Sequence, residues 1–258
     1  MDSLVFKIVA SPLLIQVASL AGRRWGPRFS GWIVALPLVS GPVVFFLALD
    51  QGTSFAAATA HGSLTGAAGQ ASFCLGYAWS ERAGRWPAAL AGGVAAFVLG
   101  ALAFQPAGRL PVALLVVSLV IWISLALALM PVVPVDRAEV SFGRWDIPWR
   151  MMTGTAVVLA ITQVAPTVGP RFSGVLAAFP VVTAVLAVFA HRLVGGFEAN
   201  AVLRGLLLGM FSFVAFYAVL ELAVERAGIA GGFTAASGAA VATQVLGAAI
   251  LRRRAARR

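Results

Sequence analysis

The chain has 258 residues, of which 60% are hydrophobic and only 11% are charged, and its mean hydropathy is +0.94. Soluble domains are about half apolar and about a quarter charged, so this composition excludes an ordinary soluble domain and indicates a membrane protein. The formal net charge is +10. In a soluble protein such an excess suggests nucleic acid, but here the basic residues flank long apolar runs and are typical of topology signals. We therefore expect the lipid bilayer as a partner and no nucleic acid.

The first apolar run, residues 4–21, has no basic segment before it and is followed by Arg23 and Arg24. A cleaved signal peptide has its basic segment in front, so we expect this run to remain as the first transmembrane span. Later apolar runs, each bounded by charge, glycine or proline, predict eight more spans. In chain order the predicted spans are residues 4–21, 29–49, 54–79, 86–104, 110–133, 151–168, 172–191, 199–220 and 229–251.

The arginines predict the orientation of these spans. An odd number of spans places the chain ends on opposite sides of the membrane. With the tail at 252–258 in the cytoplasm, the loops of that side hold arginines in groups of three, two, three, two and five, hence 15, against three on the other side. Because cytoplasmic loops carry the excess of basic residues, we expect the N-terminus outside and the C-terminus inside a bacterial inner membrane.

One loop, residues 134–150, is long enough to be called a linker, and its aromatic side chains are typical of a segment that lies at the membrane interface. These are Phe142, Trp145 and Trp149. The predicted organisation is a first four-helix repeat (1–105), a central linking helix (106–133), this cytoplasmic linker (134–150), a second four-helix repeat (151–251) and a basic tail (252–258).

The two repeats are predicted from an internal match. Residues 26–48 align without gaps on residues 169–191, with ten of 23 columns identical, and both stretches begin with GPRFSG. The same offset also pairs glycines further along, and ERAG at 81–84 recurs at 225–228. Shared Pro, Gly, Arg and Glu columns are not explained by apolar low complexity, so we infer a duplication.

Four helices return the chain to its starting side, so one extra helix between the units turns the second unit upside down. The predicted fold is therefore an all-α polytopic membrane protein with about nine transmembrane helices in a 4+1+4 order and two inverted repeats. Each half resembles the GlpM/YdgC-like family of small four-helix bacterial inner-membrane proteins, through the stretch FSGVLAAFPVVTAVLAVFAHRLVGGFEA at 172–199. The match is weaker in the first half, where Ala48 replaces His191 and Phe55 replaces Glu198. The resemblance implies a four-helix unit and little about a substrate.

Two prolines predict breaks within spans. Pro37 and Pro180 lie near the middle of aligned spans, and each removes a backbone donor from its helix, which frees the carbonyl of Ile33 or Leu176. Paired broken helices in inverted repeats are the best pointer to a transport site, although proline kinks also simply shape packing. The substrate-binding residues expected around these breaks, with a mid-span amide, are Pro37, Ser40, Gly41, Pro42, Gln70, Pro180 and Thr183. For Gln70 an interhelical hydrogen bond is the alternative.

Small residues predict close helix packing at GSLTG (62–66) and GLLLG (205–209). His61 aligns with Arg204, and it is interpreted either as a proton relay or as a residue that extends toward the interface. Arg28 and Arg171 begin the two aligned broken spans. They are either a relic of shared ancestry or charges that guard opposite entrances, which would suit an anionic substrate or a lipid head group.

No acidic residue lies near the middle of a predicted span, and no catalytic triad, phosphate loop or group of metal ligands is recognised. We therefore expect no enzyme, no cofactor and no metal. The function expected from the sequence is a transporter or flippase that moves a small neutral or anionic, or lipid-like, substrate by alternating access. The alternative is a non-transporting assembly or scaffold protein for an envelope or polysaccharide complex. Both a monomer and a homodimer are compatible with the sequence.

Overall fold

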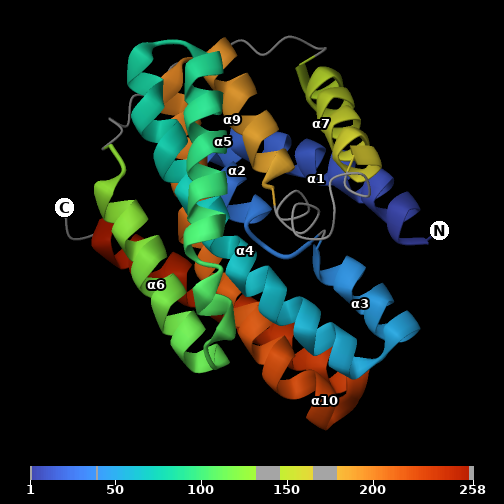
Figure 1. Ribbon diagram of the computed structural model, residues 1–258. Helices are drawn as coiled ribbons and strands as arrows, with labels where there is room; N and C mark the ends of the chain where they lie inside the picture. Colours follow the sequence, from blue (N-terminus) through green and yellow to red (C-terminus); the bar gives the residue numbers. More distant parts are fainter. Residues whose placement is uncertain (1, 39, 132–145, 165–178, 256–258) are drawn as a thin grey trace.

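The structure, a computed structural model, describes residues 2–38, 40–131, 146–164 and 179–255, and these residues are mostly helical with no strand among them (Figure 1). The helices, with η for 3₁₀, are α1 (Asp2–Trp25), α2 (Pro27–Val34), α3 (Ser40–Gln51), α4 (Thr53–Ser80), η1 (Glu81–Ala83), α5 (Trp86–Ala103), η2 (Pro106–Arg109), α6 (Val112–Leu129), α7 (Asp146–Val164), α9 (Val181–Leu193) and α10 (Gly196–Ala255). The expectation of an all-α protein is confirmed for the described residues.

Helix α10 consists of two helices joined at a kink. Gly228 has φ 70° and ψ 179°, a conformation that only glycine adopts readily and that interrupts the helix. We call residues 196–227 the first arm and residues 229–255 the second arm, and Figure 1 shows the chain reversing between them. The two arms match the predicted spans 199–220 and 229–251.

The centre of the molecule is the pair formed by α4 and the first arm of α10. His61 of α4 meets Glu221 of α10, and at the other end of the pair Glu81, just after α4, meets Asn200. As α4 advances, its partner position on α10 therefore moves backward, so the two helices are antiparallel. Their buried apolar residues form the middle of the core.

Helix α5 packs closely on α4 because small residues face each other across the contact. A Cβ atom built on Gly76 would lie 2.7 Å from the carbonyl oxygen of Gly92, and one built on Gly92 would lie 1.8 Å from the hydroxyl of Ser80. Such distances leave no room for a larger side chain, so the helix backbones approach directly. The Ala- and Gly-rich composition of the predicted span 86–104 thus permits the close approach of α5 to α4.

Helix α2 approaches the first arm of α10 in the same way. A Cβ atom on Gly31 would lie 1.9 Å from the carbonyl oxygen of Val202, and one on Gly205 would lie 1.9 Å from that of Arg28. The packing role predicted for residues 205–209 is confirmed. For residues 62–66 it is not confirmed, because a Cβ atom on the exposed Gly62 would meet nothing within 4 Å.

The predicted linking helix, α6, packs against both members of the central pair. The indole N–H of Trp122 donates to the carbonyl oxygen of Ala68 at 3.3 Å and contacts the hydroxyl of Ser72 at 3.2 Å. Beyond α6 the residues 132–145, with most of the predicted linker, lie outside the described residues. The remainder of that linker, residues 146–150, begins α7, so the helix starts five residues before the predicted boundary at 151.

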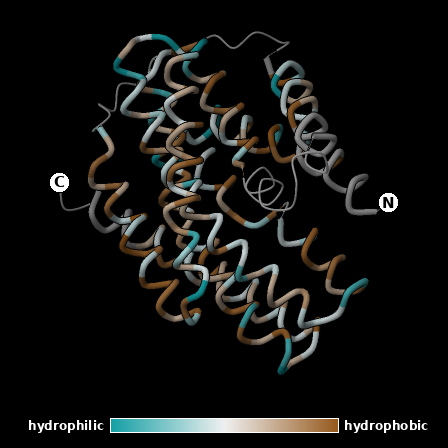
Figure 2. Tube along the Cα trace, in the orientation of Figure 1, coloured by the Kyte–Doolittle hydropathy of each residue, from teal (hydrophilic) through white to brown (hydrophobic). Residues whose placement is uncertain are grey.

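Among the residues that the structure describes, three helical segments are long and apolar enough to cross a membrane: 86–109, 112–129 and 196–249, the last of which includes both arms of α10. Their outer faces carry large apolar side chains, such as Leu99, Ile121 and Val245, which are 68%, 62% and 63% exposed. Extended exposed apolar surface is rare in soluble monomers and is typical of contact with lipid. Figure 2 shows that the hydrophilic stretches lie mainly at helix ends and connections.

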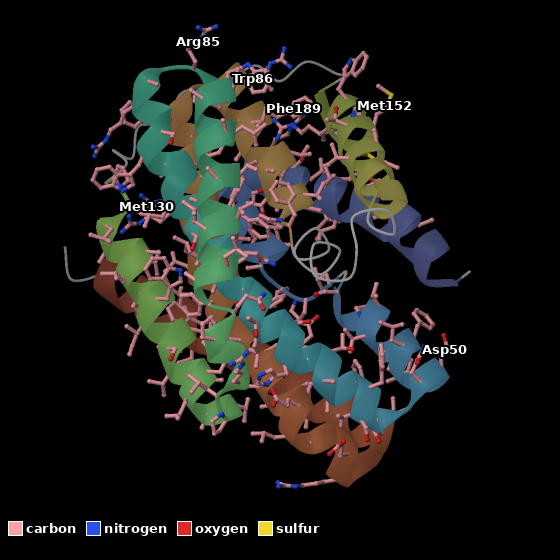
Figure 3. The ribbon with its side chains drawn as sticks, viewed as in Figure 1. Asp50, Arg85, Trp86, Met130, Met152 and Phe189 are labelled. Carbon is pink, nitrogen blue, oxygen red and sulfur yellow. The ribbon has the colours of Figure 1, made fainter. Side chains whose placement is uncertain are left out.

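Charged side chains collect at opposite ends of the helices. Figure 3 places Arg85 and Trp86 at one end of the molecule and Asp50 toward the other. Arg192 lies over the ring of Trp86 at 5.7 Å, which adds a second arginine to the first end. We call this the arginine-rich end.

Candidate functional site

The predicted span 29–49 is interrupted as its proline requires. Helix α2 ends at Val34 and α3 begins at Ser40. The carbonyl of Ile33, which Pro37 frees from its usual helical bond, accepts instead from the amide of Leu36 at 3.1 Å. A tighter last turn thus satisfies Ile33 locally.

The carbonyl group of Trp32, near the end of α2, accepts a hydrogen bond from a distant segment of the chain. The side-chain amide of Gln244, in the second arm of α10, donates to it at 3.2 Å, and the hydroxyl of Ser212 donates to the oxygen of the same amide. The buried Gln244 thus bonds the broken end of α2, and Ser212 of the first arm of α10 holds Gln244 in place. In hydrocarbon such a partner is needed, because water cannot supply it.

The residues predicted around the first break lie together at the start of α3. Pro37 occupies the break, and its carbonyl oxygen accepts from the amide of Gly41 at 2.9 Å. Gly41 is buried against the ring of Phe216, while Ser40 and Pro42 are half-buried in the first turn. Gln70 is half-buried within α4.

In the second half, Pro180 is the N-cap of α9 rather than a mid-helix residue, and Thr183 is buried in the first turn of that helix. The preceding residues 165–178, which include Arg171 and the predicted freed carbonyl of Leu176, lie outside the described residues. Pro37 and Pro180 thus both precede the start of a helix, α3 or α9.

The predicted entrance residues separate into two places. Arg28 is exposed in the first turn of α2, and its backbone touches the first arm of α10 beside the half-buried Arg204. The guanidinium of Arg204 donates to the carbonyl oxygen of Met130 at 3.5 Å. His61 lies elsewhere, and its Nδ1 atom contacts the carboxyl group of Glu221 at 2.9 Å.

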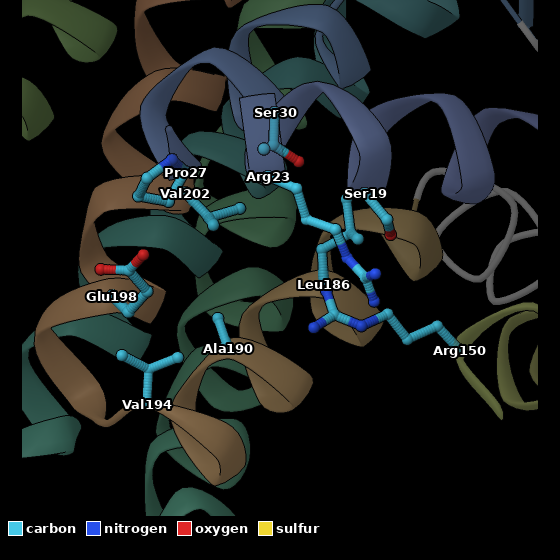
Figure 4. Close-up of a pocket in the computed structure, with 11 residues that line it drawn as sticks. Ser19, Arg23, Pro27, Ser30, Arg150, Leu186, Ala190, Val194, Glu198 and Val202 are labelled. Atoms are coloured by element: carbon cyan, nitrogen blue, oxygen red, sulfur yellow. The ribbon is translucent and has the colours of Figure 1, made fainter. Parts of the chain in front are cut away.

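A cavity of about 40 Å³ opens between the two predicted halves, near the arginine-rich end (Figure 4). It is lined from the first half by α1 and α2 and from the second half by α7, α9 and α10. Its lining residues are Ser19, Gly22, Arg23, Pro27, Ser30, Arg150, Leu186, Ala190, Val194, Glu198 and Val202. None of the predicted substrate-binding residues belongs to this lining.

The walls of this cavity differ in charge. Figure 4 shows the guanidinium groups of Arg23 and Arg150 extending to one side, with the carboxyl group of Glu198 on the opposite wall. Arg150 is only 7% exposed and also lies 5.3 Å from the ring of Phe189. The hydroxyl of the buried Ser19 has no hydrogen-bond partner among the described residues. Two guanidinium groups and an available hydroxyl form a donor-rich wall, which suits a carboxylate or phosphate oxygen.

The volume limits what this cavity accepts as it stands. Pockets for drug-sized molecules occupy about 300–1,000 Å³, whereas about 40 Å³ holds a water molecule or part of an anionic head group. A larger substrate requires α1 and α2 to separate from α9 and α10. Among the residues that the structure describes, no three His, Cys, Asp or Glu side chains gather as metal ligands.

The sequence contained one signal for this cavity that was counted only toward membrane orientation. At the offset of the internal match Arg150 aligns with Lys7, so both halves carry a basic residue in the same column. The burial of Arg150 was not evident from the sequence, because the predicted second repeat began one residue later, at 151.

Comparison with models of protein families, with curated proteins and with solved structures gave no match for the chain.

Proposed function

We propose that the protein is an integral inner-membrane transporter or flippase that moves a small anionic molecule, or an anionic lipid, by alternating access between two inverted halves. The observation that carries the proposal is the donor-rich cavity between the halves. Arg23 and Ser19 come from the first half, Glu198 comes from the second half, and Arg150 lies in α7, one residue before the predicted start of the second repeat. A site built at the junction of two units changes its access when the units rock against each other.

Corresponding features of the two halves support the inverted repeat. Gly52 and Gly195, which the internal match pairs, both have positive φ and precede α4 and α10. Gly84 and Gly228 have φ of 69° and 70° and precede α5 and the second arm of α10. The central helices that correspond, α4 and the first arm, are antiparallel, as a two-fold axis in the membrane plane would make them.

The charge of the cavity favours an anion over a cation or a purely neutral molecule. Arg150, which is 7% exposed, and Arg23 both line the cavity, and guanidinium groups bind carboxylate or phosphate oxygens through charge-assisted hydrogen bonds. A free anion and a lipid head group share this chemistry. The experiment distinguishes them by using two probes: labelled inorganic phosphate taken up by vesicles, and fluorescent phosphatidylglycerol that becomes accessible to an external quencher.

The test compares Arg150→Gln with Arg85→Gln in vesicles of phosphatidylcholine and phosphatidylglycerol. Arg85 is an exposed arginine near the same end, so it controls for a general loss of positive charge. A hydrogen bond to a charged group contributes about 1.5–3 kcal/mol, so we expect Arg150→Gln to move the transported probe about 10- to 100-fold less efficiently. Circular dichroism checks that both variants are folded. Equal transport by the two variants, or no transport of either probe by the unmodified protein, counts against the proposal.

One observation favours the alternative, a scaffold for an envelope complex. An outward-facing groove of about 610 Å³ lies between α2 and the second arm of α10. Its lining is apolar except for Gln244, and includes Trp32, Leu36 and Val245. Under this alternative, a cysteine crosslinker at Val245 joins one defined partner in native membranes, and the purified protein transports neither probe.

A further inference from the structure

His61 and Glu221 form a contact that joins the central helices at the end remote from the donor-rich cavity. The Nδ1 atom of His61 lies 2.9 Å from Oε1 of Glu221, and its Nε2 atom lies 2.9 Å from the carbonyl oxygen of Gly108 in η2. The two side chains are 24% and 19% exposed. One imidazole thus connects three elements: α4, α10 and η2.

Hydrogen-bond chemistry fixes how many protons this contact holds. A carbonyl oxygen only accepts, so Nε2 of His61 must carry a hydrogen to bond Gly108. Nδ1 then shares one proton with Glu221, and the pair is either imidazolium with carboxylate or neutral imidazole with carboxylic acid. Both forms have the same total charge. When that proton leaves, a nitrogen lone pair faces a carboxylate oxygen at 2.9 Å, and the contact becomes repulsive.

A second, independent observation extends this contact toward the broken helix. Oε2 of Glu221 and the hydroxyl of Tyr217, one turn earlier on α10, are both buried without a hydrogen-bond partner among the described residues. The Tyr217 side chain faces Ser63 of α4 and Ser40 of α3, but neither meets hydrogen-bond geometry. Neighbouring buried polar atoms of this kind usually bond a water molecule or a transient ligand.

We propose that the His61–Glu221 pair is the binding site of a coupling proton, and that Tyr217 and Ser40 connect it to the break between α2 and α3. The proposal rests on the proposed transport function, because a coupling ion acts only in a carrier. A proton from water forms the Nδ1–H or Oε1–H bond and closes α4 onto α10. Its departure to water breaks that bond and lets the two helices separate at this end.

The location fits alternating access. The first arm of α10 contributes Glu198, near its start, to the donor-rich cavity, and Glu221, near its end, to the proton site. Proton loss opens the central helix pair at one end, while the donor-rich cavity holds the substrate at the other end. Proton release and substrate binding are thereby linked through the same helix pair. Paired ionisable residues within membrane helices commonly mark such proton pathways.

Other charged groups on η2, on α10 just after Glu221 and at the end of α3 are exposed. They are Arg109 beside Gly108 on η2, Glu225 and Arg226 further along α10, and Asp50 at the end of α3. Helices α5 and α6 carry no acidic or basic residue, and the second arm of α10 carries none before Arg252. The exposed groups are screened by water and salt, so Glu221 is the principal partner of His61.

The first test needs no substrate. The protein is labelled with ¹⁵N-histidine in lipid nanodiscs, and the His61 signals are followed from pH 5 to pH 9, with His191→Gln for assignment. A carboxylate within about 4–6 Å shifts a titration midpoint by about one pH unit or more, so Glu221→Gln is expected to move the His61 midpoint by at least that amount. Glu225→Gln, which removes an exposed carboxylate from the next turn, is the matched control and moves it less. An unchanged midpoint in Glu221→Gln overturns the proton site.

The second test measures transport of the phosphate or phosphatidylglycerol probe against pH in proteoliposomes. On the sloping part of a pH profile that one proton controls, the transport rate of the unmodified protein is expected to change about tenfold per pH unit. Glu221→Gln is expected to flatten this profile, and Glu225→Gln to retain it. A profile that Glu221→Gln leaves unchanged overturns the coupling while the transport function stands. Titration as expected with no transport of either probe overturns the transport function, and the coupling role with it.

Discussion

The close approach of α2 to the first arm of α10 leads to a specific prediction about Gly205. Substitution Gly205→Ala places a Cβ atom 1.9 Å from the carbonyl oxygen of Arg28, whereas ordinary van der Waals contact begins at about 3.4 Å. The neighbouring atom is backbone, so no side-chain rotation relieves the clash. The two helices must therefore move apart until this contact approaches the ordinary distance.

That separation also weakens adjacent contacts. Gly31 and Gly209 approach the same interface, and overpacking of a dense contact costs about 1–3 kcal/mol. We expect Gly205→Ala to lie at the upper end of this range. Gly31→Ala should cost a similar amount, and the double variant less than the two together, because both separate the same helix pair.

The matched control is Gly62→Ala, from the other G-x-x-x-G sequence. Its Cβ atom enters open space on an exposed helix face, and alanine is favoured over glycine in a helix by about 0.8–1.0 kcal/mol. Unfolding is followed by circular dichroism during titration of mixed micelles with sodium dodecyl sulfate. If Gly205→Ala and Gly62→Ala have the same unfolding midpoint, the packing assigned to the α2–α10 interface is wrong.

Two more outcomes follow from the described contacts. Gln244→Ala leaves the Trp32 carbonyl without its side-chain partner, and a buried unsatisfied group costs about 1–3 kcal/mol, which the same unfolding titration measures; stability equal to the unmodified protein would contradict that role. In a Cys74→Ser background, the variants Asp50→Cys and Arg85→Cys are expected to react with an impermeant maleimide from opposite sides of sealed vesicles. The reason is that the two residues lie at opposite ends of the helices. If the maleimide labelled both cysteines from the same side, a membrane-crossing arrangement of α3 to α5 would be contradicted.

Local chemistry made much of the fold predictable. Long apolar runs bounded by glycine and charge correctly predicted α4 and α5, because helix formation in such runs depends mainly on neighbouring residues. Pro37 correctly predicted a break, since the loss of its backbone donor is independent of tertiary context. The inverted repeat and the membrane orientation stay predictions.

The candidate sites were much less predictable, because each depends on residues brought together from distant parts of the chain. The cavity required the helices that carry Arg23, Arg150 and Glu198 to meet. Glu221, which lies just beyond the predicted span 199–220, acquired its importance from His61, 160 positions away. No local spacing rule relates two such residues.

By itself, therefore, the sequence determined where the chain forms apolar helices and where proline interrupts them, because backbone donors and side-chain hydropathy act locally. Only the tertiary structure decided which of two aligned glycines packs: Gly205 meets the backbone of α2, whereas Gly62 meets open space. It also decided that the carbonyl of Trp32, and not that of Ile33, is bonded by a distant glutamine. The physical reason is common to these cases, since close packing and hydrogen bonding depend on separations of a few ångströms between segments whose sequences do not specify each other.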